Sequence, residues 1–223
     1  MSLRAIALAA LALAACTRPD EELDEFPGPP TFDSIAIARA DQSRIAGDST
    51  APVWIVIVSD FQCPYCKIWH DSVYPALRKE LVDRGGVRLA YLHMPLSQHQ
   101  HAEVTAELAM CAGEQGQFWE MHDVLFETQS EWSSLPRGTE YFRALASRVP
   151  VDTARIGACL DAGTMRPIVA ADYDRALRAQ ARSTPSFFIG DSLLVGVLPI
   201  ERFRSTVANE MRRRAAAGGK GGS

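Results

Sequence analysis

The chain has 223 residues, of which 47% are hydrophobic and 22% are charged, and its formal net charge is −4. This much apolar material is enough for one ordinary domain with a real hydrophobic core. The mildly acidic balance argues against nucleic acid as a partner. The small basic cluster at 212–214 lies beside a Gly-rich end and lacks the interleaved aromatic residues of a nucleic-acid-binding face.

Residues 1–16 predict an export signal. Arg4 precedes a run of Ala, Leu and Ile that is too short to cross a bilayer as a permanent helix, and the run ends in small residues before Cys16. Its end, Leu-Ala-Ala-Cys at 13–16, resembles the lipobox of bacterial lipoproteins, which implies that Cys16 is acylated and anchors an exported protein to a membrane. The alternative is an ordinary cleaved signal with a chance cysteine.

Residues 17–34 are rich in proline and acidic side chains. This composition cannot bury apolar surface and predicts a flexible tether. The Gly-rich end, 215–223, is likewise expected to be a disordered tail. We therefore expect the folded domain between about residue 35 and residue 214.

The first part of this domain predicts a strand, a helix and a second strand. The unbroken apolar run 53–58 is typical of a buried strand, and Pro64 suits the first position of a helix. Trp69, Val73, Leu77 and Leu81 give that helix one apolar stripe, which Pro75 interrupts. Residues 87–91 alternate as the next strand, so the segment is most simply a right-handed parallel crossover.

From about residue 98 to residue 161 the pattern is helical, and a further helix is expected at 166–181. Residues 186–189 and 193–195 flank a turn with Gly190 and predict an antiparallel hairpin. A last helix is expected at 200–213.

The motif that carries chemistry is Cys63-Pro64-Tyr65-Cys66, at the point where the first strand hands over to the helix. Unpaired N–H groups and the partial positive charge of a helix start favour a thiolate, so Cys63 is expected to be a nucleophile near neutral pH. Cys66 lies one turn inside and is expected to be more shielded and less ionised. This pattern predicts disulfide exchange.

Metal binding is the weaker interpretation of these residues. Zinc wants four ligands, and the chain offers no second close pair of cysteines beside Cys63 and Cys66. His99 and His101 are predicted to lie in a polar loop that enters a helix, and neither a metal nor another cofactor is expected.

Acylation of Cys16 would leave four cysteines, which can pair completely. Of the three possible pairings, the strand-to-helix motif favours Cys63 with Cys66 and Cys111 with Cys159. The alternative for the second pair is two separate buried thiols. Oxidising surroundings outside the cytoplasm would permit both bonds.

Three blocks together resemble the thioredoxin superfamily, in particular disulfide oxidoreductases of the DsbA type with a helical insertion. They are DFQCPYC at 60–66, CA at 111–112 with GQFWEMH at 116–122 and LF at 125–126, and TPSFFIG at 184–190. The resemblance spans about residues 35–210. It implies an α/β fold with a central mixed sheet flanked by helices, in which 35–97 and 165–214 form the thioredoxin-like domain and 98–164 an inserted α-helical subdomain.

The resemblance also implies roles around the two cysteines. Pro64 and Tyr65 would support the active site, although the DsbA type usually has a histidine where Tyr65 stands. The Thr184–Pro185 bond would be cis and face the disulfide, which leaves the Thr184 backbone able to pair with an extended peptide. Asp60 is a possible proton relay to Cys66, but a turn-capping role is favoured.

We therefore expect an exported, lipid-anchored thiol-disulfide oxidoreductase of the cell envelope or periplasm, in which Cys63 attacks and Cys66 resolves a mixed disulfide. Its partners would be unfolded or extended cysteine-containing envelope proteins, together with a redox partner that recycles the disulfide. The alternatives are a reductase or isomerase of the same fold, or a thioredoxin-like copper-binding chaperone.

Overall fold

The computed structural model describes residues 34–136 and 138–218. Within these residues, no helix has the length and apolar character that crossing a membrane requires. The predicted export signal with Cys16, residues 17–33 of the tether and residues 219–223 of the tail lie outside the described residues.

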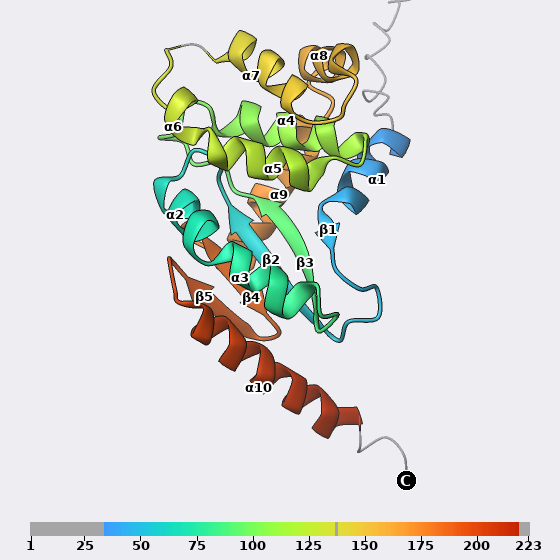
Figure 1. Ribbon diagram of the computed structural model, residues 1–223, viewed down its shortest axis with the longest axis vertical. Helices are drawn as coiled ribbons and strands as arrows, with labels where there is room; N and C mark the ends of the chain where they lie inside the picture. The colour runs from blue at the N-terminus through green and yellow to red at the C-terminus, as the bar shows by residue number, and fades with distance from the viewer. Residues whose placement is uncertain (1–33, 137, 219–223) are drawn as a thin grey trace, which may run out of the picture. The chain divides into compact units, whose positions relative to one another are not determined.

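A five-stranded mixed sheet, in the order β1-β3-β2-β4-β5, forms the centre of the described fold (Figure 1). Its central strand β2 runs parallel to β3 and antiparallel to β4, and β1 and β5 each pair antiparallel with their neighbour. This confirms the predicted α/β fold with a central mixed sheet. The strands are β1 (Ile45–Ala46), β2 (Val53–Ser59), β3 (Val87–His93), β4 (Ser186–Ile189) and β5 (Ser192–Val195).

Alternating side chains of the strands pack on opposite faces of the sheet. Ile55, Ile57 and Leu89 belong to the large core that includes Trp69 and Phe203. The side chains of the other face, Val58 with partly buried Leu92 and Phe188, form a smaller cluster with Ala176 of helix α9 (Arg166–Arg178). The sheet is therefore covered on both faces.

The crossover between β2 and β3 contains three helical segments where the sequence predicts one kinked helix. They are α2 (Pro64–Ser72), α3 (Tyr74–Leu77) and the π-helical turn η1 (Arg78–Val82). The break falls at Val73, because Pro75 has no N–H to continue the ladder. The wider turn in η1 buries Val82, while Leu81 of the predicted stripe is only partly buried.

Helices fill the chain between β3 and α9. They are α4 (Ala102–Glu114), α5 (Phe118–Glu127), α6 (Gln129–Trp132), α7 (Thr139–Leu145), the 3₁₀ turn η2 (Ala146–Arg148) and α8 (Thr153–Ala162). Helix α1 (Ser34–Ser43) packs against α4. Helix α1 was not predicted from the sequence, and its first residue, Ser34, does not belong to the predicted tether.

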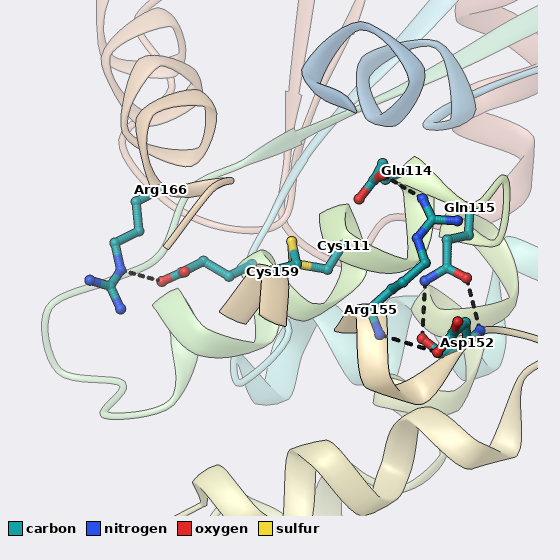
Figure 2. The surroundings of a disulfide bond; sticks show 8 residues. Cys111, Glu114, Gln115, Asp152, Arg155, Cys159 and Arg166 are labelled. Atoms are coloured by element: carbon teal, nitrogen blue, oxygen red, sulfur yellow. Dashed lines mark hydrogen bonds and ion pairs between the residues drawn. A yellow bond between two sulfur atoms is a disulfide. The ribbon is translucent and has the colours of Figure 1, made fainter. Parts of the chain in front are cut away.

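A disulfide bond joins α4 to α8 through Cys111 and Cys159 (Figure 2). Polar contacts flank it where α4 ends and α8 begins: Arg155 lies 2.6 Å from Glu114, and the side chain of Gln115 bonds both backbone groups of Asp152. Asp152 also caps α8 by accepting from two backbone N–H groups. The disulfide therefore belongs to an ordered contact between two helices.

The hairpin of β4 and β5 forms as predicted, and Gly190 in its turn has a φ of +56°. Helix α10 (Ile200–Gly218) buries Phe203 and Val207 and contacts α3, β2 and β4. It runs through 215–218, so the prediction of a disordered tail was wrong for those residues. Alanines 215–217 are strong helix formers, which lets the helix continue past Arg214.

Candidate active site

The two cysteines of the Cys-Pro-Tyr-Cys motif lie at the start of α2, shortly after the end of β2. Cys63 caps α2 in an extended conformation, with φ −68° and ψ 123°, and Pro64 occupies the first turn. Both cysteines are unbonded thiols in this structure, and Cys63 is 3% exposed while Cys66 is fully buried. Only Cys63 thus has any contact with solvent.

The surroundings of Cys63 favour its thiolate. A hydrogen bond from the side chain of Cys66 is the largest cause that lowers the pKa of Cys63, which falls from its usual 9.0 to about 6 against the opposing effect of burial. A side-chain hydrogen bond from Thr184 and backbone N–H groups of Cys66 and Tyr65 lower this pKa further. The backbone donors belong to the first turn of α2, as the sequence predicts for a helix start.

The surroundings of Cys66 favour its protonated thiol. Burial is the largest cause that raises the pKa of its thiol well above the usual value, and the hydrogen bond and negative charge of Cys63 raise it further. The pair therefore holds one proton between the two sulfurs near neutral pH, with the negative charge on Cys63.

The loop before β4 forms another side of the site. The Thr184–Pro185 peptide bond is cis, and the Cys63 thiol lies 3.5 Å from the carbonyl oxygen of Thr184. The Thr184 hydroxyl is buried and has no other hydrogen-bond partner among the described residues, so it is available as a donor to the Cys63 thiolate. Residues 121 positions apart in sequence thus meet at one sulfur.

The surface beside Cys63 is apolar. Tyr65 is 62% exposed and Ile68 is 50% exposed, although both are large hydrophobic side chains. They lie three residues apart on α2 and therefore share one helix face. An apolar face next to a reactive thiol suits contact with another polypeptide.

Asp60 does not contact Cys66 through its carboxylate. That carboxylate accepts hydrogen bonds from the backbone N–H groups of Gln62 and Leu96 at 2.8 and 2.9 Å, and it lies 2.7 Å from Nδ1 of His99. Only the backbone N–H of Asp60 reaches Cys66. These contacts agree with the favoured turn-capping role, and the proton relay to Cys66 stays a prediction.

Two glutamines that sequence analysis did not single out hold the loop before α2. The side-chain amide of Gln129 in α6 donates to the carbonyls of Phe61 and Cys63 at 2.6 and 3.1 Å. Gln62 donates to the carbonyl of Ser133 and accepts from the backbone N–H of His101. Nothing in the local sequence indicates these contacts, since each joins residues 39 to 71 positions apart.

The histidines of the predicted polar loop serve the structure. Nδ1 of His99 contacts the Asp60 carboxylate, and Nε2 of His101 lies 2.7 Å from the carbonyl oxygen of Leu135. His101 is buried and packs edge-to-face against Phe142. Both imidazoles therefore connect the loop after β3 to its neighbours.

The mixed sheet, a Cys-Pro-Tyr-Cys motif at the start of α2 and a cis proline facing it define a thioredoxin-like α/β protein. A family model described as Thioredoxin matches residues 39–209, and the chain belongs to this family.

Similar proteins carry two kinds of name. The Na(+)/H(+) antiporter NhaA 3 of Salinispora tropica is 36% identical over 177 residues, which are 79% of this chain and 26% of that protein. The chain thus spans about a quarter of the length of the antiporter relatives that it matches. Disulfide bond formation protein D of Bacillus subtilis is 23% identical over 175 residues, which are 75% of this chain and 77% of that protein.

Solved structures share the fold. BdbD from Bacillus subtilis, in its oxidised form, aligns with a TM-score of 0.69 and 22% identity, covering 76% of this chain and 92% of that chain. Alpha-DsbA1 of Wolbachia pipientis aligns with a TM-score of 0.66 and 18% identity, covering 78% and 93%.

Proposed function

We propose that this protein is a thiol-disulfide oxidoreductase of the DsbA type, with Cys63 as the attacking and Cys66 as the resolving cysteine. The observation that carries the proposal is the asymmetry of the pair: the pKa of Cys63 is lowered to about 6 while burial raises that of Cys66. The name of disulfide bond formation protein D, a relative that this chain matches over most of its length, supports the same activity.

The exchange follows from this asymmetry. In the oxidising direction, a client thiolate attacks the Cys63 sulfur of the Cys63–Cys66 disulfide. The bond between the two sulfurs breaks, and Cys66 leaves with the electron pair and takes up a proton. A second client thiolate then attacks the client sulfur of the mixed disulfide, and Cys63 leaves as the stable thiolate. The client gains a disulfide and the enzyme becomes a dithiol, so no cofactor is needed.

The clients are extended segments of cysteine-containing envelope proteins. The Thr184 carbonyl beside Cys63 is an acceptor for a client backbone N–H, and the exposed side chains of Tyr65 and Ile68 offer apolar contact to residues flanking the client cysteine. Pro64 and Pro185 support this arrangement by fixing the backbone on either side of the sulfur.

The setting of the domain completes the proposal. Residues 1–16 form a lipoprotein signal, acylated Cys16 anchors the exported chain, and the tether comprises residues 17–33, because Ser34 begins α1. The helical segment 98–164 is an insertion between the two parts of the thioredoxin-like domain, with Cys111–Cys159 as its structural disulfide. A membrane-bound or soluble redox partner reoxidises the Cys63–Cys66 pair.

The direction of transfer follows from how strongly the thiolate is stabilised. Tyr65 stands where a histidine would add positive character, so we expect a reduction potential between about −230 mV and about −120 mV. Equilibration of the protein with glutathione measures it. A value as low as that of thioredoxin, about −270 mV, would contradict a mainly oxidising role.

Trapping of the mixed disulfide tests the activity itself. A Cys66→Ser variant should retain the attack by Cys63 but lose resolution, and it should hold clients in mixed disulfides that dithiothreitol releases. A Cys63→Ser variant, which keeps the buried thiol, is the matched control and should trap none. Equal trapping by both variants, or none by Cys66→Ser, would refute the assigned roles.

A further inference from the structure

Two histidines and an aspartate form a cluster at the contact between α2 and α5. The candidate ligand atoms of His70, His122 and Asp123 all lie within 4.8 Å of one another. Oδ1 of Asp123 is 2.7 Å from Nδ1 of His122 and 3.3 Å from Nε2 of His70. His122 is fully buried, His70 nearly so, and the side chain of Asp123 is 45% exposed.

Carboxylate oxygens surround His70, which suits a metal ion on one of its ring nitrogens. Both ring nitrogens of His70 face carboxylate oxygens, because Nδ1 lies 3.0 Å from Oδ1 of Asp71 and Nε2 faces Asp123. A neutral imidazole has one N–H and satisfies only one of these contacts. A metal ion on Nε2 would leave the N–H on Nδ1 for Asp71, the arrangement in which a carboxylate orients a metal-bound histidine.

The cluster is open to solvent on one side. His70 and Asp123 line a surface cleft of about 420 Å³ together with Glu120, Glu127 and Arg78. The two carboxylates of Glu120 and Glu127 outnumber the one guanidinium of Arg78, so the cleft attracts cations. A small ion can therefore reach His70 and Asp123 from the cleft, while the fully buried His122 lies behind them, next to Asp123.

We propose that His70, His122 and Asp123 bind Zn²⁺, with the fourth coordination position facing the cleft. Two imidazoles and a carboxylate are a preferred zinc donor set. Tetrahedral ligands at 2.0–2.1 Å from zinc are roughly 3.3 Å apart. Asp123 lies 2.7 and 3.3 Å from the two imidazoles and all three ligand atoms lie within 4.8 Å of one another, so zinc needs a shift of the half-exposed Asp123 side chain and an adjustment between the two rings.

The surroundings of His122 fit this role. The ring is fully buried, and its Nδ1 lies 2.7 Å from Oδ1 of Asp123. Its Nε2 is buried without a hydrogen-bond partner among the described residues, and the ring packs against Phe61, Tyr91 and Phe126. With zinc on Nδ1, the proton lies on Nε2, where an N–H among aromatic rings makes weak favourable contacts.

The site would tie the redox helix to the helical segment. His70 follows Cys66 by one turn of α2, whereas His122 and Asp123 belong to α5. Zinc would cross-link these two helices independently of the thiol chemistry, and binding to the native state alone would raise the unfolding temperature.

Zinc titration of the oxidised protein tests the proposal, because the Cys63–Cys66 disulfide removes the thiolates that would otherwise bind metal. Calorimetry should show one Zn²⁺ per chain, and zinc should raise the unfolding temperature. Asp123→Asn and His70→Gln should each weaken binding about tenfold or more. Glu127→Gln is the matched control from the same cleft and should leave the affinity within about twofold.

Cobalt gives a readout that does not depend on the variants folding. Co²⁺ bound to the unmodified, oxidised protein should show the intense visible bands of a tetrahedral site, and Zn²⁺ should displace it. The absence of stoichiometric zinc binding, an octahedral cobalt spectrum, or equal weakening by Glu127→Gln and Asp123→Asn would each overturn the proposal.

Discussion

Replacing Cys66 with alanine tests what sets the reactivity of Cys63. The side chain of Cys66 is the largest single cause that lowers the pKa of Cys63 to about 6. At pH 7 a thiol with this pKa is about 90% thiolate, whereas one with the usual pKa of 9.0 is about 1% thiolate. Loss of the strongest donor should reduce the thiolate-to-thiol ratio at least about tenfold, which moves the pKa of Cys63 to about 7 or higher.

The assay is the pH dependence of alkylation of the reduced protein by iodoacetamide. The midpoint of the profile is the quantity to compare, because a less acidic thiolate is intrinsically more nucleophilic and partly offsets its lower abundance at any single pH. In Cys66→Ala only Cys63 remains beside the disulfide-bonded pair among the described cysteines, so with Cys16 replaced by serine the profile reports one group.

Two matched variants sharpen the interpretation. Cys66→Ser keeps a buried O–H donor of similar size, so its midpoint should stay closer to that of the unmodified protein than the midpoint of Cys66→Ala. Thr184→Val removes the other side-chain donor with little change of shape and should raise the midpoint by a smaller amount. A Cys66→Ala midpoint that stays near pH 6 would refute the reasoning and assign the acidity to the backbone of α2.

Three further predictions concern proton coupling and stability. The reduced pair loses the Cys63 proton above a pH of about 6. The reduction potential should therefore fall by about 59 mV per pH unit below pH 6 and by about 30 mV per pH unit above it. A constant slope up to pH 8 would contradict the lowered pKa of Cys63. Replacing Cys111 and Cys159 by serine opens a loop with a sequence separation of 48 and should lower the unfolding free energy in urea by about 4 kcal/mol, while a loss below about 1 kcal/mol would argue against loop closure as the cause. Arg44→Met leaves the fully buried Asp172 without its main cation and should cost about 3–5 kcal/mol in the same assay; adding Asp172→Asn should recover part of this, and no recovery would mean that the loss comes from packing.

The sequence predicted those parts of the fold that depend on local patterns. The apolar run of β2, the proline at the start of α2 and the glycine turn of the hairpin each act over a few residues, and each lies where expected. Helix α1 was not predicted because its buried residues are Ala36 and Ala40, whose small side chains give little apolar signal. Small residues on this face allow α1 and α4 to pack closely. The helices are so close that a Cβ on Gly113 of α4 would lie 2.5 Å from the Ser43 hydroxyl of α1.

The polar contacts around the site could not be predicted from the sequence alone. Arg44 and Asp172 form a buried ion pair across 128 residues, and Asp172 also accepts from the backbone N–H of His93. No local pattern distinguishes these charges from the many exposed ones. The same holds for His70 and His122, which belong to different helices and which the fold brings together.

The acidity of Cys63 is consequently a property of the tertiary structure as well as of the motif. Its thiolate has hydrogen-bond donors from α2 and from the loop before β4. The start of α2 is held in place by the side-chain amide of Gln129, which donates to the carbonyls of residues 61 and 63. A short Cys-Pro-Tyr-Cys peptide has neither the buried Cys66 thiol nor Thr184 beside its sulfur. Its pKa should therefore lie near the usual value, and the difference between peptide and protein measures what the fold contributes to the chemistry.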